Sequence, residues 1–398
     1  MSLKVIELGN LVSAPFCAKL LASIGAEVIK VEKPGTGDDA RKMGPFPGDK
    51  PHPEKSGLFQ YLNADKLSIS LNLETKTGLS IFQELIKDAD ILVENNPPRE
   101  MRRLGLEYDT LKILNPKLIM TSITPFGSSG PYRDYKGTDL ISFHAGGLGY
   151  ITPRPATGEP DEGPLRVKGH FADFMGGLDA SAGTMCVLCE RDRTGMGQHL
   201  DISQQESIAG GLTWNMAIDS YTGETIRREG ASGFAPVATM ACKDGFIDIQ
   251  CNTENQWQGL VELMGDPDWA HLAIFKDPVA RAENWESLQP LISHWLKEQP
   301  KQEFYHSAQA KGVPTAPVNT IEELTKSDQF AARGFFVETE HPGVGTMKYP
   351  GSLLKFSRIP SRVGRRAPLL GEHNEAIYHG RLGYSMLDLV KMRNAGVI

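Results

Sequence analysis

The sequence lacks long apolar runs and is poor in cysteine. No apolar stretch in its 398 residues approaches the roughly 20 residues of a membrane span, and its first residues lack the basic start and cleavage site of a secretory signal. The five cysteines are an odd number. Cys186 and Cys189 form a C-x-x-C without the second pair that a zinc site needs, and we interpret them as small core residues inside a helix. These absences predict a cytoplasmic protein that binds neither metal nor membrane.

An excess of positive charge is also missing. The chain has 42 Lys and Arg against 49 Asp and Glu, a formal net charge of -7. A protein this acidic is not expected to bind nucleic acid through a general basic surface. With 40% hydrophobic residues it can build a core, and its length predicts two domains.

A dinucleotide-binding glycine motif is absent from the first turn. The segment Gly9–Pro15 follows an expected strand but has only one glycine, so the close backbone approach to a pyrophosphate is not encoded. Glu32 ends the next expected strand, where nicotinamide enzymes place a ribose-binding acid. One acid without the glycines argues against a nicotinamide dehydrogenase.

Strands alternate with helices over the first part of the chain. The expected strands are 4–8, 27–32, 67–72, 90–94 and 118–123, and the expected helices include 14–24 and 76–89. This alternation predicts an α/β fold: a Rossmann-like large domain with a parallel sheet, followed by a smaller α+β domain. Ligands of such sheets bind outside the carboxyl ends of the strands. We expect the large domain at 1–200, the small domain at 225–330 and a return to the large domain at 331–398.

Several basic residues fall at or just after the expected strand ends. A solvated surface is the ordinary interpretation of such residues, and a pocket for phosphate groups is the other. The pattern alone leaves both open. The residues are Lys33, Arg41, Lys76, Arg102, Arg103 and Lys136.

Asp173 is the most unusual carboxylate of the chain. It is flanked by Phe171, Ala172, Phe174 and Met175, and two glycines follow. Apolar surroundings strip the hydration of a carboxylate and make it more reactive if it ionises. The glycines would leave backbone N–H groups open to an anionic ligand. An ordinary helix N-cap is the competing interpretation, and the residues alone slightly favour it.

Taken together and in order, segments along nearly the whole chain resemble the class III coenzyme A transferases (CaiB/BaiF family), which include formyl-CoA, carnitine-CoA and bile-acid CoA transferases. The matching segments are Ala14-Pro15, Gly25-Ala-Glu-Val-Ile-Lys-Val-Glu-Lys33, Gly35-Thr-Gly-Asp38, Asn63-Ala-Asp-Lys66, Ser70-Leu-Asn-Leu73, Val93-Glu-Asn95, Gly127-Ser-Ser-Gly-Pro-Tyr132, Phe171-Ala-Asp-Phe174, Gly197-Gln-His-Leu-Asp-Ile-Ser203 and Pro368-Leu-Leu-Gly-Glu-His373.

The resemblance implies that Asp173 is a nucleophile that forms a covalent anhydride and then a thioester with CoA. Coenzyme A and acyl-CoA would be substrates, with no permanently bound cofactor, and the partner would be a second copy of the chain in an interlocked homodimer. The residues implied to bind CoA are Val12, Ala14, Lys33, Asn72, Leu73, Thr75, Lys76, Asn95, Asn96, Arg103 and Lys136.

Departures from the family pattern narrow the expected chemistry. Val12 stands where formyl-CoA transferase has an active-site glutamine, so oxalate and formate are not expected substrates. The segment 250–254 lacks the glycines of that enzyme's covering loop. A mid-sized or hydrophobic acid is expected, in a pocket shaped by Val12, Phe46, Tyr135, His144, Tyr150 and Phe234.

The alternative function is that of an α-methylacyl-CoA racemase, a related branch of the superfamily. Those enzymes use a histidine where this chain has Thr138, and racemisation needs a base on each face of the substrate. His144 is interpreted as structural, and His170 as a group that could support Asp173.

Overall fold

The computed structural model describes residues 3–152, 163–225, 234–358 and 364–398. The chain forms two compact units. The large unit comprises 1–154, 163–226 and 331–398, and the small unit comprises 155–162 and 227–330. The large unit is therefore built from both ends of the chain.

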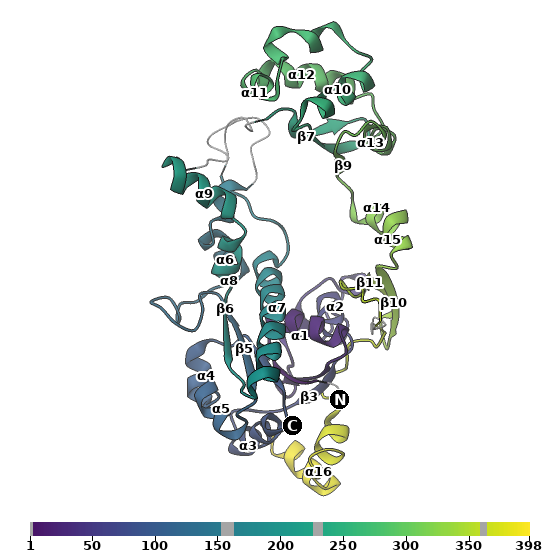
Figure 1. Ribbon diagram of the computed structural model, residues 1–398. Coiled ribbons are helices and arrows are strands. Elements are labelled where there is room, and N and C mark those ends of the chain that lie inside the picture. Colours follow the sequence, from purple (N-terminus) through teal and green to yellow (C-terminus); the bar gives the residue numbers. More distant parts are fainter. Residues whose placement is uncertain (1–2, 153–162, 226–233, 359–363) are drawn as a thin grey trace. The chain divides into compact units, whose positions relative to one another are not determined.

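A six-stranded parallel sheet forms the centre of the large unit (Figure 1). The strands are β1 (Lys4–Leu8), β2 (Glu27–Glu32), β3 (Leu67–Ser70), β4 (Ile91–Glu94), β5 (Ile119–Thr124) and β6 (His199–Ser203). Their order is β3-β2-β1-β4-β5-β6, in which the winding reverses between β1 and β4. The predicted α/β class with a parallel sheet is confirmed. The sixth strand, β6, was not among the expected strands.

Helices cover both faces of this sheet. The helices of the large unit are α1 (Ser13–Ser23), α2 (Gly57–Asn63), α3 (Lys76–Lys87), α4 (Pro98–Leu104), α5 (Tyr108–Leu114), α6 (Asp139–Ala145), α7 (Phe171–Thr194), α8 (Gln204–Gly210), α9 (Thr213–Thr222) and, near the C-terminus, α16 (Met386–Asn394). Gly25 follows α1 with a φ of 106°, a left-handed conformation that glycine adopts without strain and that ends helices.

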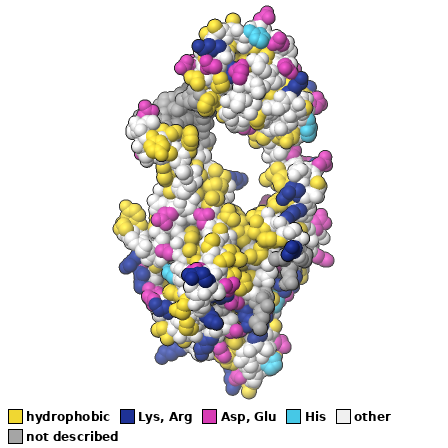
Figure 2. All heavy atoms as spheres, viewed as in Figure 1, with side chains coloured by type: hydrophobic (Ala, Val, Ile, Leu, Met, Phe, Trp, Pro, Cys, Tyr) yellow, Lys and Arg dark blue, Asp and Glu magenta, His cyan; other side chains and the backbone are white. Residues whose placement is uncertain are grey.

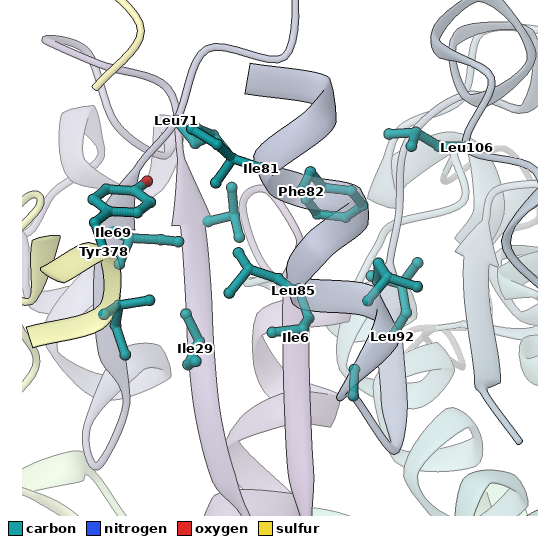
Figure 3. Packing of buried hydrophobic residues seen from close by; sticks show 14 of the residues in the cluster. Ile6, Ile29, Ile69, Leu71, Ile81, Phe82, Leu85, Leu92, Leu106 and Tyr378 are labelled. Carbon is teal, nitrogen blue, oxygen red and sulfur yellow. The ribbon is translucent and has the colours of Figure 1, made fainter. Parts of the chain in front are cut away.

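One face of the sheet packs against α3, α5 and the C-terminal segment. Alternate strand residues point to this face because the side-chain period of a strand is two. Ile6 and Leu92 of the strands meet Phe82 and Leu85 of α3, and Tyr378 joins them from the C-terminal segment (Figure 3). The last part of the chain therefore completes the core of the large unit.

The other face packs against α1 and α7. Val5, Val93 and Ile119 point to this side, where they meet small side chains of α1 and α7. A Cβ on Gly177 of α7 would come within 2.6 Å of the Ser13 carbonyl oxygen. Helices α1 and α7 are therefore so close at this point that only a glycine fits there. Gly177 and its neighbour Gly176 are buried inside α7. The expectation that these glycines present backbone N–H groups to a ligand is wrong: they permit close packing.

Buried charges join the carboxyl ends of β1 and β2. Lys30 Nζ lies 2.6 Å from Glu7 Oε1 and 2.7 Å from Asp38 Oδ2, and Lys66 Nζ lies 2.7 Å from Glu7 Oε2. All four side chains are fully buried. Burial alone would raise the pKa of Glu7, but Lys30 and Lys66 hold it below its ordinary value.

Two residues considered for ligand binding belong to another buried ion pair. Arg41 donates to both oxygens of Glu32, at 2.7 and 2.9 Å, and its side chain is fully buried. Glu32 also accepts from Ser68 Oγ at 2.7 Å. Arg41 is therefore not available for phosphate, and Glu32 is occupied by structural contacts where a dehydrogenase would bind ribose.

The small unit contains a three-stranded antiparallel sheet and several helices. Its strands are β7 (Val237–Cys242), β8 (Gly245–Gln250) and β9 (Thr315–Pro317), and its helices are α10 (Glu254–Leu263), α11 (Pro278–Glu283), α12 (Trp285–Leu296), α13 (Lys301–Ala310) and α14 (Ile321–Thr325). Ile247, Ile249, Trp257, Leu288 and Phe304 form much of its separate core. The chain then passes through α15 (Asp328–Ala332) to the hairpin of β10 (Phe336–His341) and β11 (Gly345–Pro350).

Exposed apolar side chains mark parts of the large unit. Figure 2 shows hydrophobic side chains gathered around α1 and α7 on the face in view. Trp214 and Tyr221 of α9 are 74% and 89% exposed. Cys186 and Cys189 lie on α7 as predicted, but they are exposed rather than in the core. Among the described residues, no helix has the length and apolar character needed to cross a membrane.

Candidate active site

A cavity of about 760 Å³ lies at the carboxyl ends of the parallel strands. It includes the point between β1 and β4 where the winding reverses, the expected ligand position in such sheets. Residues following β1, β4, β5 and β6 line it together with the start of α7. They include Asn10, Leu11, Asn95, Asn96, Arg99, Thr124, Lys136, Thr138, Asp139, Arg166, His170, Asp173 and Gln204.

Asp173 lies in the first turn of α7, but it does not cap the helix. The N-cap position belongs to His170. Two of the free N–H groups of the helix are satisfied from outside, because Asp139 Oδ1 accepts from the backbone N–H groups of Ala172 and Asp173 at 2.7 and 3.2 Å. The capping interpretation of Asp173 is therefore wrong, and its carboxylate is left for other contacts.

Two side chains hold the carboxylate of Asp173, one at each oxygen. Gln204 Nε2 donates to Oδ1 at 2.7 Å, and His170 Nδ1 lies 3.1 Å from Oδ2. The Asp173 side chain is 16% exposed and lines the cavity. Such a partly desolvated and oriented carboxylate suits nucleophilic attack on a bound substrate.

The charges around Asp173 shift the titration of its neighbours. The hydrogen bond to Asp173 raises the pKa of His170, although partial burial opposes the rise. Burial raises the pKa of Asp139, and the nearby charge of Asp173 contributes to that rise. Arg166 Nη1 lies 3.8 Å from Asp139 Oδ2 and brings a guanidinium to the same wall of the cavity.

The first loop of the chain forms another wall and is held tightly. Leu11 has a φ of 61°, which is uncommon for a residue with a side chain. Its N–H donates to Asp38 Oδ1 at 2.9 Å. Asn95 accepts from the N–H of Asn10 at 2.8 Å and donates to the carbonyl oxygen of Asn10 at 2.7 Å. Asn95 and Asp38 therefore fix the loop that faces Asp173.

Three of the predicted CoA-binding residues line this cavity. They are Asn95, Asn96 and Lys136. Arg99 and Arg133 line it too, so cationic side chains stand along the cavity that contains Asp173. Guanidinium and ammonium groups are the usual partners of phosphate and carboxylate anions.

Other predicted residues form a second group outside that lining. Arg103 Nη2 pairs with Glu74 Oε1 at 2.6 Å and with Glu100 Oε1 at 2.7 Å. Arg103, and more weakly Lys33, hold the pKa of Glu74 below its ordinary value, so these two cations lie near the same carboxylate. Lys76 is exposed at the first position of α3.

The remaining predicted residues around β3 have structural contacts. Thr75 is the N-cap of α3, and its Oγ1 accepts from the N–H of Gly78 at 3.0 Å. Asn72 donates to the carbonyl oxygen of Gly396 at 3.1 Å. Leu73 packs against the core of the large unit. These contacts leave CoA binding by the three residues as a prediction.

The pantetheine and acid-pocket predictions have mixed placements. Val12 and Ala14 are fully buried, and neither is among the residues that line the cavity. Tyr135 lines the cavity with Asp173, whereas Phe46, His144 and Tyr150 are not among its lining residues. Phe234 and the segment 250–254 belong to the small unit.

Sequence reasoning missed Asp139, Gln204 and Arg166 as site residues. Gln204 directly follows β6, so recognising that strand would have placed it at the carboxyl edge of the sheet. Asp139 directly follows Thr138, which is the N-cap residue of α6 in the structure. In the described part of the chain, no group of three or more His, Cys, Asp or Glu residues is arranged to hold a metal ion.

Comparison with known proteins agrees with this fold. CoA-transferase family III matches residues 2–374. Succinyl-CoA–D-citramalate CoA-transferase of Chloroflexus aurantiacus is 31% identical, over 99% of this chain and 97% of that protein. Human succinyl-CoA:glutarate CoA-transferase is 30% identical, over 99% of this chain and 89% of that protein. The crystal structure of a CAIB/BAIF family protein from Brucella suis superposes with a TM-score of 0.84 at 31% identity, covering 95% of this chain and 98% of that one.

The chain therefore belongs to CoA-transferase family III. The resemblance seen in the sequence is confirmed over nearly its whole length, and the protein is an enzyme that transfers CoA.

Proposed function

We propose that the enzyme transfers CoA between carboxylic acids through covalent intermediates on Asp173. The supporting observation is the carboxylate of Asp173, which opens onto the cavity and is held by Gln204 and His170 instead of capping its own helix. A carboxylate so placed acts as a nucleophile toward a thioester.

The proposed reaction has four steps. Asp173 Oδ2 attacks the acyl carbon of the donor thioester, the carbon–sulfur bond breaks, and CoA leaves as a thiolate. The thiolate attacks Cγ of Asp173 in the resulting anhydride, and the donor acid leaves with Oδ2. The acceptor carboxylate attacks Cγ of the aspartyl-CoA thioester and expels CoA again. In the last step the thiolate attacks the acceptor's acyl carbon, which yields the new acyl-CoA and restores the Asp173 carboxylate.

For the CoA moiety we propose that the two groups of predicted residues act at different ends. Asn95, Asn96 and Lys136 would contact the part nearer Asp173, with Val12 and Ala14 near the pantetheine end. The nucleotide and phosphates would use Lys33, Asn72, Leu73, Thr75, Lys76 and Arg103. Arg103 would then exchange its pairing with Glu74 or Glu100 for a phosphate.

For the acids we propose a mid-sized carboxylic acid. Succinate, glutarate and citramalate, which occur in the names of the similar enzymes, are acids of this size. A panel of acyl-CoA donors and free acids, with mass-spectrometric detection of new thioesters, identifies the pair.

We also propose that the enzyme is a cytoplasmic homodimer. Exposed Trp214 and Tyr221 support an interaction surface, because exposed apolar patches mark such sites.

The decisive variant is Asp173→Ala. We expect it to lose turnover while it still binds CoA, measured by calorimetry. Donor acyl-CoA given alone to the unsubstituted enzyme should leave an adduct that hydroxylamine or borohydride traps at Asp173, located by peptide mass spectrometry. Turnover by Asp173→Ala at the original rate would refute the covalent mechanism.

Epimerisation of an acyl-CoA is the second candidate, because His170 places an imidazole beside Asp173. A racemase would exchange the α-proton of an acyl-CoA with deuterated water in the absence of any acceptor acid. CoA transfer through Asp173 requires no such exchange. Deuterium at the α-carbon, without new thioesters from the acid panel, would favour the racemase.

A further inference from the structure

Gln204 is buried and locked beside Asp173. It is 4% exposed, and its Oε1 accepts from Ser142 Oγ at 3.0 Å while its Nε2 donates to Asp173 Oδ1 at 2.7 Å. A carboxylate only accepts hydrogen bonds, so the amide must turn its NH₂ group toward Asp173. A Cβ on Gly176 would lie 3.0 Å from Gln204 Cγ, so the glycine leaves room for this side-chain position.

The two oxygens of Asp173 have different fates in the proposed reaction. The oxygen that attacks the donor becomes the bridging atom of the anhydride and leaves with the donor acid. The other oxygen stays on Cγ as the carbonyl oxygen of both anhydrides and of the aspartyl-CoA thioester. Whenever a thiolate or carboxylate attacks Cγ, negative charge develops on that second oxygen.

We propose that Gln204 is a catalytic residue that donates a hydrogen bond to this developing oxyanion on Asp173 Oδ1. The inference rests on the proposed covalent mechanism and extends it to a second residue. The distance of 2.7 Å is within the range of effective oxyanion donors, which act best when buried and oriented beforehand. Ser142 supplies that orientation by holding the other end of the amide.

The position of His170 assigns the roles of the two oxygens. Oδ1 is held by the buried Gln204, whereas Oδ2 lies beside the 26% exposed side chain of His170, which lines the cavity. Oδ2 is therefore the attacking oxygen, and Oδ1 remains with Gln204 throughout. Gln204 stabilises the two steps at Cγ of Asp173, and it has no role at the acyl carbon of the donor.

The test uses Gln204→Met, which keeps an unbranched side chain but removes the donor. Loss of one oxyanion donor typically lowers kcat by about 10²- to 10³-fold, and we expect a loss of this order with little change in the KM for acyl-CoA. Rapid quenching after mixing with donor acyl-CoA alone, followed by intact-protein mass spectrometry, separates the steps. The variant should accumulate the donor acyl adduct, whereas the unsubstituted enzyme proceeds to the CoA adduct.

Gln205→Leu is the matched control. Gln205 is the next residue, donates to the carbonyl oxygen of Ala145 and is not among the residues lining the cavity, so its loss should leave kcat and the adducts unchanged. Gln204→Glu provides a second variant of nearly the same shape if Gln204→Met does not fold, as judged by circular dichroism.

Two outcomes would overturn the role of Gln204. One is an unchanged kcat and adduct distribution in both Gln204 variants. The other is equal slowing of donor-adduct formation and of its conversion to the CoA adduct, which would make Gln204 a positioning residue only. Both are distinct from failure of the covalent mechanism, because that failure appears as activity in Asp173→Ala.

Discussion

Lys30 offers a sharp test of how the buried charges stabilise the large unit. It is fully buried between Glu7 and Asp38, at 2.6 and 2.7 Å, and its Nζ also donates to the carbonyl oxygen of Gly9 at 3.1 Å. Lys30→Met would keep the apolar stem and remove the charge. Removing one partner of a buried ion pair costs about 3–5 kcal/mol. Glu7 retains Lys66 as a partner, but Asp38 has no other ion-pair partner among the described residues, so we expect a loss of about 3–5 kcal/mol.

The matched control is Lys4→Met on the neighbouring strand. Lys4 pairs with Asp88, but their side chains are 46% and 78% exposed, and exposed pairs contribute about 1 kcal/mol or less. Urea unfolding is followed by far-ultraviolet circular dichroism and by tryptophan fluorescence. Four of the five tryptophans, all except Trp214, lie in the small unit, so fluorescence reports mainly on that unit.

We expect Lys30→Met to move the circular-dichroism transition of the large unit to lower urea, while the fluorescence transition stays near its original position. Lys4→Met should move neither by much. If the two variants lose the same stability, the buried charges do not support the unit in the way described. A shift of the fluorescence transition alone would contradict the assignment of Lys30 to the large unit's stability.

Two further predictions concern titrating groups. Burial raises the pKa of Glu94 from 4.5 to about 7, so between these pH values the folded protein binds one more proton than the unfolded chain. The contribution of Glu94 to stability therefore falls by up to about 3 kcal/mol as pH rises through that range. Glu94→Gln should remove this pH dependence of the free energy of unfolding, measured with urea from pH 5 to 8, and an unchanged pH dependence would disprove the assignment. The hydrogen bond to Asp173 raises the pKa of His170, so Asp173→Asn should bring the pKa of His170 back toward the ordinary imidazole value. NMR titration measures this pKa, with the His271 signal as an internal reference. An unchanged pKa of His170 in the variant would contradict the contact.

The α/β core could be predicted because its signals are local. The short apolar stretches of β1 and β2 are buried on both faces of the sheet, and the helical spacing in α1 follows from which side chains face the core. The strand β6 escaped prediction because it is polar and little buried: His199 and Asp201 are exposed, and only Ser203 is buried. The exposure of Cys186 and Cys189 on α7 was also not predicted, because their apolar neighbours in the sequence do not indicate which face of the helix is covered.

The site was predictable only in part, for a related reason. Asp173 stands out in the sequence through its apolar flanks, yet whether it caps a helix depends on which residue satisfies the free N–H groups there. That residue is Asp139, which is 34 positions away from Asp173. Arg41 followed a strand like the other basic residues, and only the buried partner Glu32 distinguishes it from a phosphate ligand.

The contacts at the start of α7 explain why a carboxylate there can serve chemistry. A helix N-terminus attracts negative charge, and an aspartate at this place would ordinarily spend its oxygens on the helix's own N–H groups. Asp139 takes over that task from α6, so Asp173 keeps the favourable field of the helix without the capping bonds. Gln204 then orients one oxygen from the end of β6, and His170 leaves the other facing the cavity. The position of the proposed nucleophile is thus defined by Asp139 from α6, Gln204 after β6 and the N-cap residue His170, and no feature of the segment 171–177 alone establishes it.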